Sequence, residues 1–462
     1  MSVFENIKNV YLIGIGGIGM SAIARYFKSL NKSVAGYDKT SSTLILSLIS
    51  EDISIHFDDN TNLIPESFIK QKSNTIIIYT PAIPNEHSEL NYFINNSFQI
   101  YKRSEILGII TEPMTTIAVA GSHGKTTIST LIAHIFKQSK KDCNAFLGGI
   151  SKNYKTNLLL SDNSNYAIVE ADEFDRSFLQ LSPFAAVITA IDADHLDIYF
   201  SKEELIKSFN LFAKKLQPNG FLLLKNTLVN TIEKNDKIKI FTYSLNLKSD
   251  FYANNIKIIN GLYNFDIVTP NKTIENLNLG IPGLVNVENA VAAVSIAYLF
   301  GIEENIIRES LQNFKGIIRR FDYQIKNNDL IFIDDYAHHP EEIKATINSI
   351  KEIYPDKKIT GIFQPHLFSR TRDLAEEFAN SLELLDRLVL LDIYPARELP
   401  IEGISSKIIL DKVNIENKSI CSKNELFNLL KNDDIDILLT LGAGDIDSLV
   451  EPIKNILLNK IK

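Results

Sequence analysis

The stretch TTIAVAGSHGKTT, residues 115–127, decides the fold at the centre of the chain. Its first half is apolar and predicts a β-strand, and the residues that follow predict a helix continuing through His134. Between them, glycines in the turn 121–124 allow backbone N–H groups to point inward at an anion. The N-terminus of the helix adds positive potential at the same place. The stretch therefore predicts a phosphate-binding loop in an α/β domain.

The residues after this turn give the loop its expected chemistry. Lys125 is placed to reach the β- and γ-phosphates of a nucleotide, and Thr126 to hold Mg²⁺. The usual pattern has a further glycine where Val119 stands, so this is a shortened version of the loop. Glycine turns also join strands to helices for packing alone, but a Gly-Lys-Thr-Thr run in this position favours phosphate binding.

Two further residues follow neighbouring strands of the same segment. Glu170 lies near the end of the predicted strand 166–172, and His195 follows the predicted strand 185–192. Ligands gather at the carboxyl ends of parallel strands, so we expect both side chains near the phosphate loop. Mg²⁺ prefers oxygen ligands, which favours Glu170 over a histidine. The other acids of these loops are interpreted as mostly solvated: Asp172, Glu173, Asp175, Asp192, Asp194 and Asp197.

A second glycine motif, GIGGIG at residues 14–19, follows the predicted strand 9–16. Asp38 closes the next predicted strand, which completes the fingerprint of a dinucleotide-binding fold. Alone, this motif would suggest NAD. Because the chain has a separate phosphate loop for ATP, another nucleotide diphosphate is the favoured ligand of this motif.

A third group of polar residues lies in the C-terminal part of the chain. Arg319 and Arg320 precede DDYAHHP at residues 334–340, where the acids end a predicted strand and the proline starts a helix. An arginine there can neutralise a transferring phosphoryl group, and an Asp–His pair can orient or deprotonate an amine. Two arginines, Arg370 and Arg372, suit carboxylate or phosphate recognition. The adjacent histidines lack a third ligand at zinc-site spacing, so zinc is disfavoured.

The pattern of strands and helices predicts three α/β domains in the 462 residues. We place them at 1–111, 112–313 and 314–462. The first and third are predicted to be Rossmann-like. The central one is predicted to be a P-loop-type ATPase domain with a parallel sheet. Past Gly220 the sequence suggests short antiparallel strands in an additional small sheet.

Composition limits the classes of function. The formal net charge of −8 disfavours binding to nucleic acid. Two distant cysteines argue against disulfides and fit a reducing compartment. No run is long and apolar enough to span a membrane, and no secretory signal starts the chain. We expect a soluble cytoplasmic protein, monomeric or homodimeric, without a membrane partner.

Taken together, these motifs resemble the Mur ligase family, specifically its alanine-adding branch. GIGGIGMSAIA, GSHGKTT, EADEFDRSF, DADHLDIY, PGLVNVENAVAA, RRFD, DDYAHHP and QPHLFSRTRDL occur in the family's order and cover nearly the whole chain. The resemblance implies ATP-dependent, Mg²⁺-dependent ligation of L-alanine to the carboxylate of UDP-N-acetylmuramate through an acyl phosphate. It places that reaction in peptidoglycan precursor synthesis, with a UDP-sugar domain, an ATP domain and an amino-acid domain in that order.

The resemblance also implies roles for individual residues. It gives Lys125, His195, Arg320, Asp335 and His338 catalytic roles. The implied nucleotide contacts are Gly121, Ser122, His123, Gly124, Lys125, Thr126, Thr127, Asn289, Arg320 and Asp335. The implied metal ligands are Thr126, Glu170 and His195. The implied substrate contacts are Gly16, Gly17, Gly19 and Asp38 for the sugar nucleotide, and Tyr336, His338, His366 and Arg370 for the amino acid.

Two positions depart from the family pattern, and three alternatives stay open. Val285 stands near a position where histidine is frequent, and Leu367 where an arginine often follows Pro-His. Ser208-Phe209-Asn210 replaces the lysine that some sister ligases carbamylate, so we expect no such modification. The alternatives are a murein-recycling ligase that adds a preformed peptide, an NAD-dependent oxidoreductase, and a non-catalytic paralogue.

Overall fold

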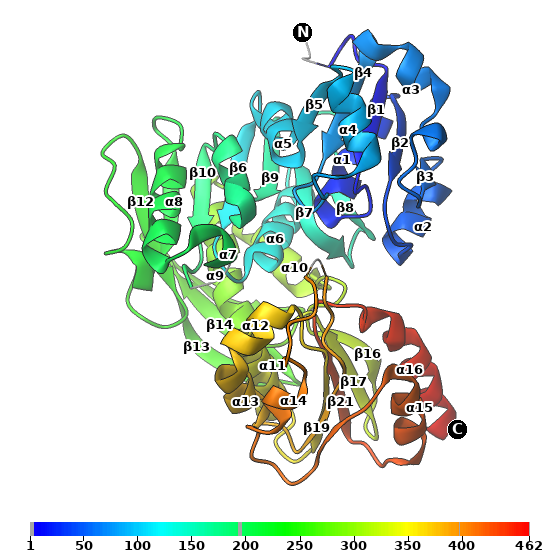
Figure 1. Cartoon of the computed structure of the whole chain (residues 1–462). Coiled ribbons are helices and arrows are strands. Elements are labelled where there is room, and N and C mark those ends of the chain that lie inside the picture. The colour runs from blue at the N-terminus through cyan, green and yellow to red at the C-terminus, as the bar shows by residue number, and fades with distance from the viewer. Residues whose placement is uncertain (1–3, 193–195, 397, 462) are drawn as a thin grey trace. The chain divides into compact units, whose positions relative to one another are not determined.

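The computed structural model describes residues 4–192, 196–396 and 398–461 (Figure 1). Three β-sheets flanked by helices confirm the predicted α/β class. The described chain forms two compact units. The first comprises Met1–Ile256, Phe265–Asn278 and Glu288–Lys315, and the second comprises Lys257–Asn264, Leu279–Val287 and Gly316–Lys462. The first two sheets contribute most of the first unit and the third sheet lies in the second, while the exact domain boundaries stay a prediction.

The first sheet is parallel throughout, in the order β3-β2-β1-β4-β5. Its strands are β1 (Asn9–Ile13), β2 (Ser33–Tyr37), β3 (Ser54–His56), β4 (Thr75–Tyr79) and β5 (Gln99–Lys102). Its helices are α1 (Ile18–Ser29), α2 (Thr43–Ser50), α3 (Glu66–Lys70), α4 (Ser88–Asn95) and α5 (Arg103–Thr111). Side chains of β1 alternate between faces: Val10 and Leu12 pack with α1 and α5, and Tyr11 and Ile13 with α3 and α4.

The central sheet has the order β15-β14-β13-β12-β11-β10-β6-β9-β7-β8. Its strands are β6 (Thr115–Ala120), β7 (Asn144–Ser151), β8 (Thr156–Leu159), β9 (Tyr166–Glu170), β10 (Ala185–Ile188), β11 (Phe221–Lys225), β12 (Lys239–Ser244), β13 (Phe251–Ile259), β14 (Leu262–Val268) and β15 (Thr273–Asn278). Its helices are α6 (Lys125–Gln138), the 3₁₀ helix η3 (Phe174–Gln180), α7 (Leu196–Tyr199), α8 (Lys202–Lys214), α9 (Leu284–Leu299) and α10 (Glu304–Asn313). The strand–loop–helix order around β6 therefore follows the prediction.

The strands after Gly220 differ from the prediction in how they pair. β11 pairs in parallel with β10, and β12 pairs in parallel with β11, so both strands extend the main sheet. β13 pairs in parallel with β12 as well, so the antiparallel pairing suggested for these three strands is wrong. The residues of such short strands do not show the direction in which each strand pairs. The segment 226–238 is long enough for the crossover that parallel pairing needs.

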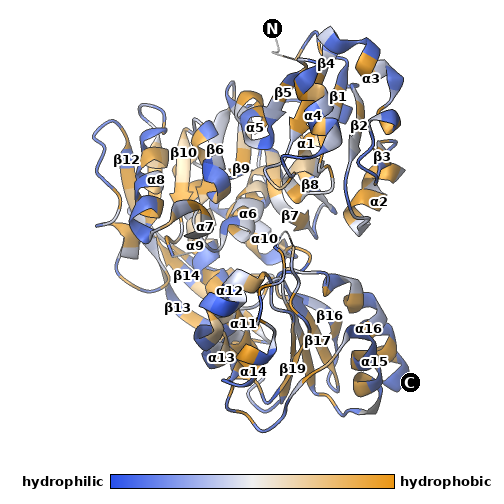
Figure 2. Cartoon of the chain, in the orientation of Figure 1, coloured by the Kyte–Doolittle hydropathy of each residue, from blue (hydrophilic) through white to orange (hydrophobic). Residues whose placement is uncertain are grey.

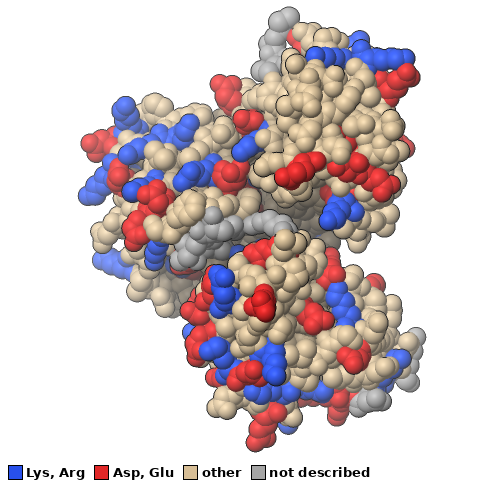
Figure 3. All heavy atoms as spheres, viewed as in Figure 1, with Lys and Arg blue, Asp and Glu red and all other residues tan. Residues whose placement is uncertain are grey.

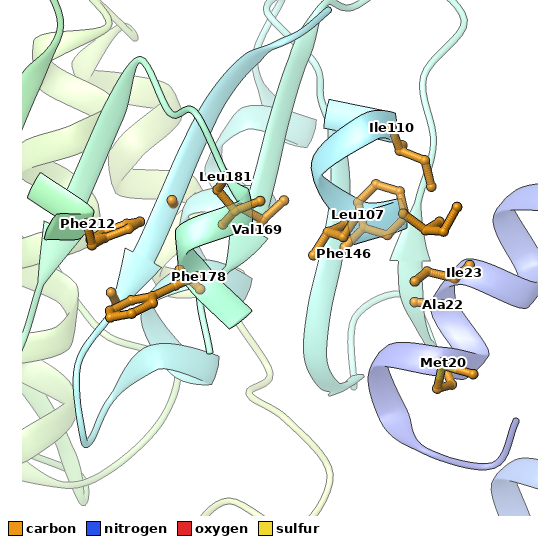
Figure 4. Close-up of a cluster of buried hydrophobic side chains, with 14 of the residues drawn as sticks. Met20, Ala22, Ile23, Leu107, Ile110, Phe146, Val169, Phe178, Leu181 and Phe212 are labelled. Atoms are coloured by element: carbon orange, nitrogen blue, oxygen red, sulfur yellow. The ribbon is translucent and has the colours of Figure 1, made fainter. Parts of the chain in front are cut away.

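The first and central sheets share one hydrophobic core, part of which Figure 4 shows. Met20 and Ile23 of α1 and Leu107 of α5 belong to the same buried cluster as Phe146 of β7. The buried side chain of Asn157 on β8 adds polar contacts. Its Nδ2 donates to the Ile18 carbonyl oxygen at 2.6 Å and to Ser21 Oγ at 2.9 Å. The first turn of α1 is thereby attached directly to the central sheet.

The third sheet has the order β16-β17-β21-β18-β19-β20, parallel except for the antiparallel pair β16–β17. Its strands are β16 (Asp322–Lys326), β17 (Ile331–Asp335), β18 (Ile359–Phe363), β19 (Arg387–Leu390), β20 (Lys418–Ile420) and β21 (Ile437–Leu441). Its helices are α11 (Pro340–Ile353), α12 (Phe368–Asp373), α13 (Ala375–Leu382), α14 (Lys407–Leu410), α15 (Lys423–Asn432) and α16 (Asp447–Ile461). Ile331 and Ile333 pack with α11 and α13, and Phe332 between them packs with α15 and α16.

Hydropathy follows these layers. In Figure 2 the strands are mostly hydrophobic and many helices carry a hydrophobic and a hydrophilic side. Basic and acidic side chains are interspersed on the face drawn in Figure 3. None of the helices in the described part of the chain is both long and apolar enough to cross a membrane.

Candidate active site

The phosphate loop contains two glycines that its backbone requires. Gly121 has φ = 129°, and a Cβ there would lie 2.1 Å from Thr189 Oγ1. Gly124 has φ = 79°, and a Cβ there would lie 2.8 Å from Asn289 Oδ1. Both positions therefore exclude a side chain. Asn289, predicted to contact the nucleotide, lies against this loop.

Lys125 is held inside the loop by a neighbouring carboxylate. Its Nζ donates to the Gly121 carbonyl oxygen at 2.7 Å and to both carboxylate oxygens of Glu173 at 2.8 Å. Burial alone would lower the pKa of Lys125, but the carboxylates of Glu173, Asp172 and Glu170 outweigh it and raise the pKa. The ammonium group therefore stays charged at neutral pH, as a phosphate-binding lysine requires.

Contacts with the segment after β10 hold the rest of the loop in place. The Ser122 N–H donates to the Ala190 carbonyl oxygen at 3.0 Å, and Ser122 Oγ accepts from the Asp192 N–H at 2.9 Å. His123 Nε2 lies 3.3 Å from Asp192 Oδ2. The loop thus joins the carboxyl ends of β6 and β10, the edge at which parallel sheets bind ligands.

Glu170 lies at the same edge, in the register expected for a metal ligand near the loop. It ends β9 and pairs with Val119 of β6. A Cβ on Gly148 of β7 would lie 2.0 Å from Glu170 Oε2, so the carboxylate lies directly over this glycine. Thr126 is buried in the first turn of α6, and Thr127 beside it is half-buried. Glu170 and Thr126 supply the oxygen donors that Mg²⁺ prefers.

The third predicted metal ligand, His195, lies outside the described residues, as does Asp194. Within residues 4–192, 196–396 and 398–461, no group of three or more His, Cys, Asp and Glu side chains is arranged to hold a metal ion. The described residues therefore provide two oxygen donors of the predicted site, and the complete ligand set stays a prediction.

The acidic loop that follows β9 corrects one expectation. Glu173, predicted to be solvated, is only 2% exposed because it pairs with the phosphate-loop lysine. Asp172 Oδ2 accepts from Arg103 Nη2 at 3.2 Å, and Asp175 Oδ2 accepts from Lys102 Nζ at 3.0 Å. Three acids of this loop thus bind three cations from two other segments of the chain.

The same loop has strained backbone. Asp175 has φ = 52° and Arg176 has φ = 54°, two consecutive left-handed residues that cost roughly 1–2 kcal/mol each. The Arg176 guanidinium lies 5.4 Å from the centroid of the Tyr199 ring, and the Tyr199 hydroxyl donates to the Glu173 carbonyl oxygen at 2.5 Å. These contacts, together with the ion pairs, stabilise the strained conformation.

The N-terminal glycine motif has the geometry that its fingerprint predicts. Gly14 has φ = 82°, and a Cβ there would lie 2.5 Å from Thr80 Cγ2. The Gly16 N–H donates to Asp38 Oδ2 at 2.8 Å, which brings the predicted acid to the motif. The N-terminus of α1 follows immediately, so its backbone N–H groups add positive potential there.

A cavity of about 210 Å³ is lined both by this motif and by the acidic loop. Gly17 and Gly19 contribute to its wall, as do Glu170 and Asp172. The positive charge comes from Arg103, which lies so close to the motif that a Cβ on Gly19 would be 2.9 Å from its Nη1. Apolar parts of the wall, labelled in Figure 4, are Met20, Ala22, Leu107 and Phe146.

In the second unit, two arginines before β16 lie against Tyr336. The guanidinium carbons of Arg319 and Arg320 are 5.1 and 5.0 Å from the centroid of the Tyr336 ring. Arg319 is the more buried, with its Nε 3.3 Å from Asp334 Oδ2. Arg320 lies 3.7 Å from Glu342 Oε1 and is about a third exposed, at 32%. Arg319 therefore stabilises the fold, and Arg320 is better placed to meet an anionic ligand.

His338 has the properties of a neutral base. Its Nδ1 lies 3.0 Å from the Tyr336 carbonyl oxygen and 3.5 Å from Glu342 Oε2. Burial lowers the pKa of His338 to about 4, and the positive charge of Arg370 adds to this effect. If Nδ1–H donates to the carbonyl, Nε2 is left to accept a proton. The centroid of the His366 ring lies 6.0 Å from that of His338.

The predicted Asp–His pair takes a different form. The Asp335 carboxylate accepts from Thr346 Oγ1 at 2.8 Å and from the Ala337 N–H at 3.1 Å. The carboxylate beside His338 is that of Glu342, one helical turn away in sequence. The second unit thus brings to one edge of its sheet Arg320, Asp335, Tyr336, His338, His366 and Arg370. At this edge the carboxyl ends of β17 and β18 lie on either side of that of β21.

Replacing Asp335 with asparagine is expected to make folding stability less dependent on pH. Burial raises the pKa of Asp335 from 3.8 to about 6. Ionisation of Asp335 therefore lowers the free energy of unfolding as the pH rises from about 4 to about 6. Above about pH 6 the total loss stays constant, on the order of 3 kcal/mol. Thermal unfolding at pH 5 and pH 8 should show a smaller loss of stability with rising pH in D335N than in the wild type. The exposed Asp356→Asn is the control, and identical profiles for D335N and the wild type would contradict the assignment.

Two residues of these sites were not predicted from the sequence. Arg103 directly follows β5, which ends at Lys102. Two basic residues at the carboxyl end of a strand are the sequence signal that could have indicated an anion site here. Glu342 lies four residues after His338 in the first turn of α11, a spacing that brings side chains together. The contacts of Arg103 come from other segments of the chain, whereas Glu342 lies beside His338 of its own segment.

Comparison with known families covers almost the whole chain. Residues 9–114 match the family described as "Mur ligase family, catalytic domain", residues 119–297 the "Mur ligase middle domain", and residues 319–444 the "Mur ligase, glutamate ligase domain". A protein of Parabacteroides distasonis named UDP-N-acetylmuramate–L-alanine ligase is 50% identical over 453 residues, 98% of each chain.

Solved structures with related folds give the same architecture. A UDP-N-acetylmuramate–alanine ligase from Thermotoga maritima superposes with a TM-score of 0.82 at 24% identity, covering 98% of this chain and 99% of that one. A murein peptide ligase from Psychrobacter arcticus superposes with a TM-score of 0.74 at 21% identity, with the same coverage. At these identities the two superpositions support the fold alone.

Proposed function

The chain belongs to the Mur ligase family, and from this premise we propose that it joins L-alanine to the muramyl carboxylate of UDP-N-acetylmuramate, with cleavage of ATP to ADP and phosphate. The name of the relative that is 50% identical supports this choice of substrates. The single observation that carries the proposal is the cavity lined by both Gly17–Gly19 and Glu170. It allows a sugar nucleotide held at α1 to direct its carboxylate towards the phosphate loop.

In the first step, a carboxylate oxygen of the muramyl group attacks the γ-phosphorus of ATP. The bond from phosphorus to the β–γ bridging oxygen breaks, giving an acyl phosphate and ADP. Lys125 and the N-terminus of α6 would neutralise charge on the phosphates. Arg103 and the N-terminus of α1 offset the charge of the sugar nucleotide.

Mg²⁺ would accompany ATP. Glu170 and Thr126 would hold it, with His195 as the predicted third ligand, and the ion would neutralise charge on the β- and γ-phosphates. The oxygen donors fit Mg²⁺, and the buried Lys125 nearby would offset part of the remaining phosphate charge. ATP with Mg²⁺ therefore suits this group of residues better than NAD does.

In the second step, the amine of L-alanine attacks the carbonyl carbon of the acyl phosphate. The tetrahedral intermediate collapses, the bond to the phosphate oxygen breaks, and an amide and phosphate result. The amine must lose protons in this step, and His338, which is unprotonated at neutral pH, is available to accept one. Arg370 would bind the carboxylate of the amino acid. The product would be an early precursor of peptidoglycan.

Phosphate release with UDP-N-acetylmuramate, ATP and a panel of acceptors tests this function. We expect turnover with L-alanine to exceed turnover with glycine or L-serine, and a preformed tripeptide to be a poor acceptor. Turnover with the tripeptide alone would favour the murein peptide ligase alternative. A change in nicotinamide absorbance without phosphate release would favour an oxidoreductase, and no turnover with any acceptor would favour a non-catalytic paralogue.

A further inference from the structure

The acidic loop, residues 172–176, lies between the phosphate loop and the cavity and contributes to both. Asp172 and Phe174 line the cavity, whereas Glu173 between them points to the phosphate loop. Successive residues of the loop therefore face two different ligand sites. Nothing in the roles described so far requires this arrangement.

On the side of the phosphate loop, the Glu173 carboxylate is the counter-ion of Lys125. Both of its oxygens lie 2.8 Å from Lys125 Nζ, the group proposed to bind the phosphates of ATP. A buried carboxylate tolerates neither the loss of its cation nor the approach of another anion. When phosphates reach Lys125, the Glu173 carboxylate must therefore shift or share the lysine.

On the side of the cavity, Asp172 forms an ion pair with Arg103, the cation that would bind the sugar nucleotide. Its Oδ2 accepts from Arg103 Nη2 at 3.2 Å, and the Arg103 side chain is 16% exposed. Asp175, further along, accepts from Lys102 Nζ at 3.0 Å. The loop thus neutralises positive charges on both sides.

We propose that the acidic loop couples the two substrate sites, so that binding of the nucleotide at Lys125 moves Glu173 and, with it, releases Arg103 from Asp172 for the anionic sugar nucleotide. The inference rests on the proposed function and adds a coupling between its two substrate sites. Glu173 and Asp172 are adjacent in the chain, so a movement of the loop backbone that carries Glu173 away from Lys125 also displaces Asp172. The left-handed backbone at Asp175 and Arg176 favours such a movement, because the strain is relieved once the ion pairs break. Coupling of this kind is reciprocal.

Calorimetric titration of UDP-N-acetylmuramate, with and without saturating non-hydrolysable ATP analogue and Mg²⁺, measures the coupling. In the wild type we expect the analogue to tighten binding of the sugar nucleotide about fivefold or more. In Asp172→Asn, Arg103 is already released. The affinity for UDP-N-acetylmuramate without the analogue should then approach the wild-type affinity measured with it. The ratio of the two affinities, with and without the analogue, should fall below about twofold. Glu173→Gln should also lose the ratio while still binding both ligands.

Asp162→Asn is the matched control, because it removes one exposed carboxylate from the same unit without touching either site. It should keep the wild-type ratio. A purely structural role for the loop would lower thermal stability and both affinities together and leave the ratio unchanged, which would overturn the inference. So would a wild-type chain that binds both ligands independently. A wild-type chain that does not bind UDP-N-acetylmuramate at all would instead refute the proposed function.

Discussion

Replacing Lys125 with alanine is expected to lower phosphate release about a thousandfold, because the change removes a preorganised charge from the transferring phosphoryl group. It also leaves the Glu173 carboxylate, 2% exposed, without its cation. An uncompensated buried charge costs about 3–5 kcal/mol, so the single variant should also unfold at a lower temperature. Phosphate release and thermal unfolding should both be measured.

A second variant separates these two effects. The double substitution Lys125→Ala with Glu173→Gln removes the buried charge together with its partner. We expect most of the thermal stability to return in the double variant and the loss of turnover to persist. If the double variant regained wild-type turnover, Lys125 would have only a structural role, and the assignment of the phosphate loop would be wrong.

Replacing Glu170 with glutamine is expected to lower turnover at least about a hundredfold, because it removes a negative oxygen donor from the proposed magnesium site. Gly148→Ala tests the position of the same carboxylate without changing Glu170 itself. Its Cβ would lie 2.0 Å from Glu170 Oε2, so the carboxylate must move although the Gly148 backbone tolerates alanine. We expect an intermediate loss in G148A, about tenfold, with little change in unfolding temperature.

A magnesium titration of phosphate release distinguishes this role from a general loss of packing. Both variants should need more Mg²⁺ than the wild type for half-maximal turnover, whereas Asp162→Asn should behave as the wild type. An unchanged magnesium requirement in E170Q would show that Glu170 does not hold the ion.

The parts of the fold that depend on local sequence were predicted well. The loop at 121–124 and the motif at 14–19 need glycine for reasons that lie within a few residues, and both have the expected strand–loop–helix form. The direction of β11 and β12 was not predicted. It depends on how a long connection crosses the sheet, which the strands themselves do not encode.

The same distinction applies to the candidate site. Lys125 and His338 were predicted because each lies in a compact motif. Glu173 was expected to be solvated, since its partner is 48 residues away in the chain. Arg103 was not identified because its role arises from Gly19 and Asp172, which belong to two other segments. Charge alone does not show which acids of a loop are buried.

The hydrophobic cluster shared by α1, α5 and β7 makes folding of the first sheet depend on the central sheet. The first sheet has a core of its own on one face, but the side of α1 and α5 that faces β7 is protected from water only by the central sheet. The two sheets should melt as one cooperative body, and a fragment ending near residue 111 should aggregate when expressed alone. A chimaera that takes its first sheet and helices from another protein should fold only if β7 and β8 come from that same protein.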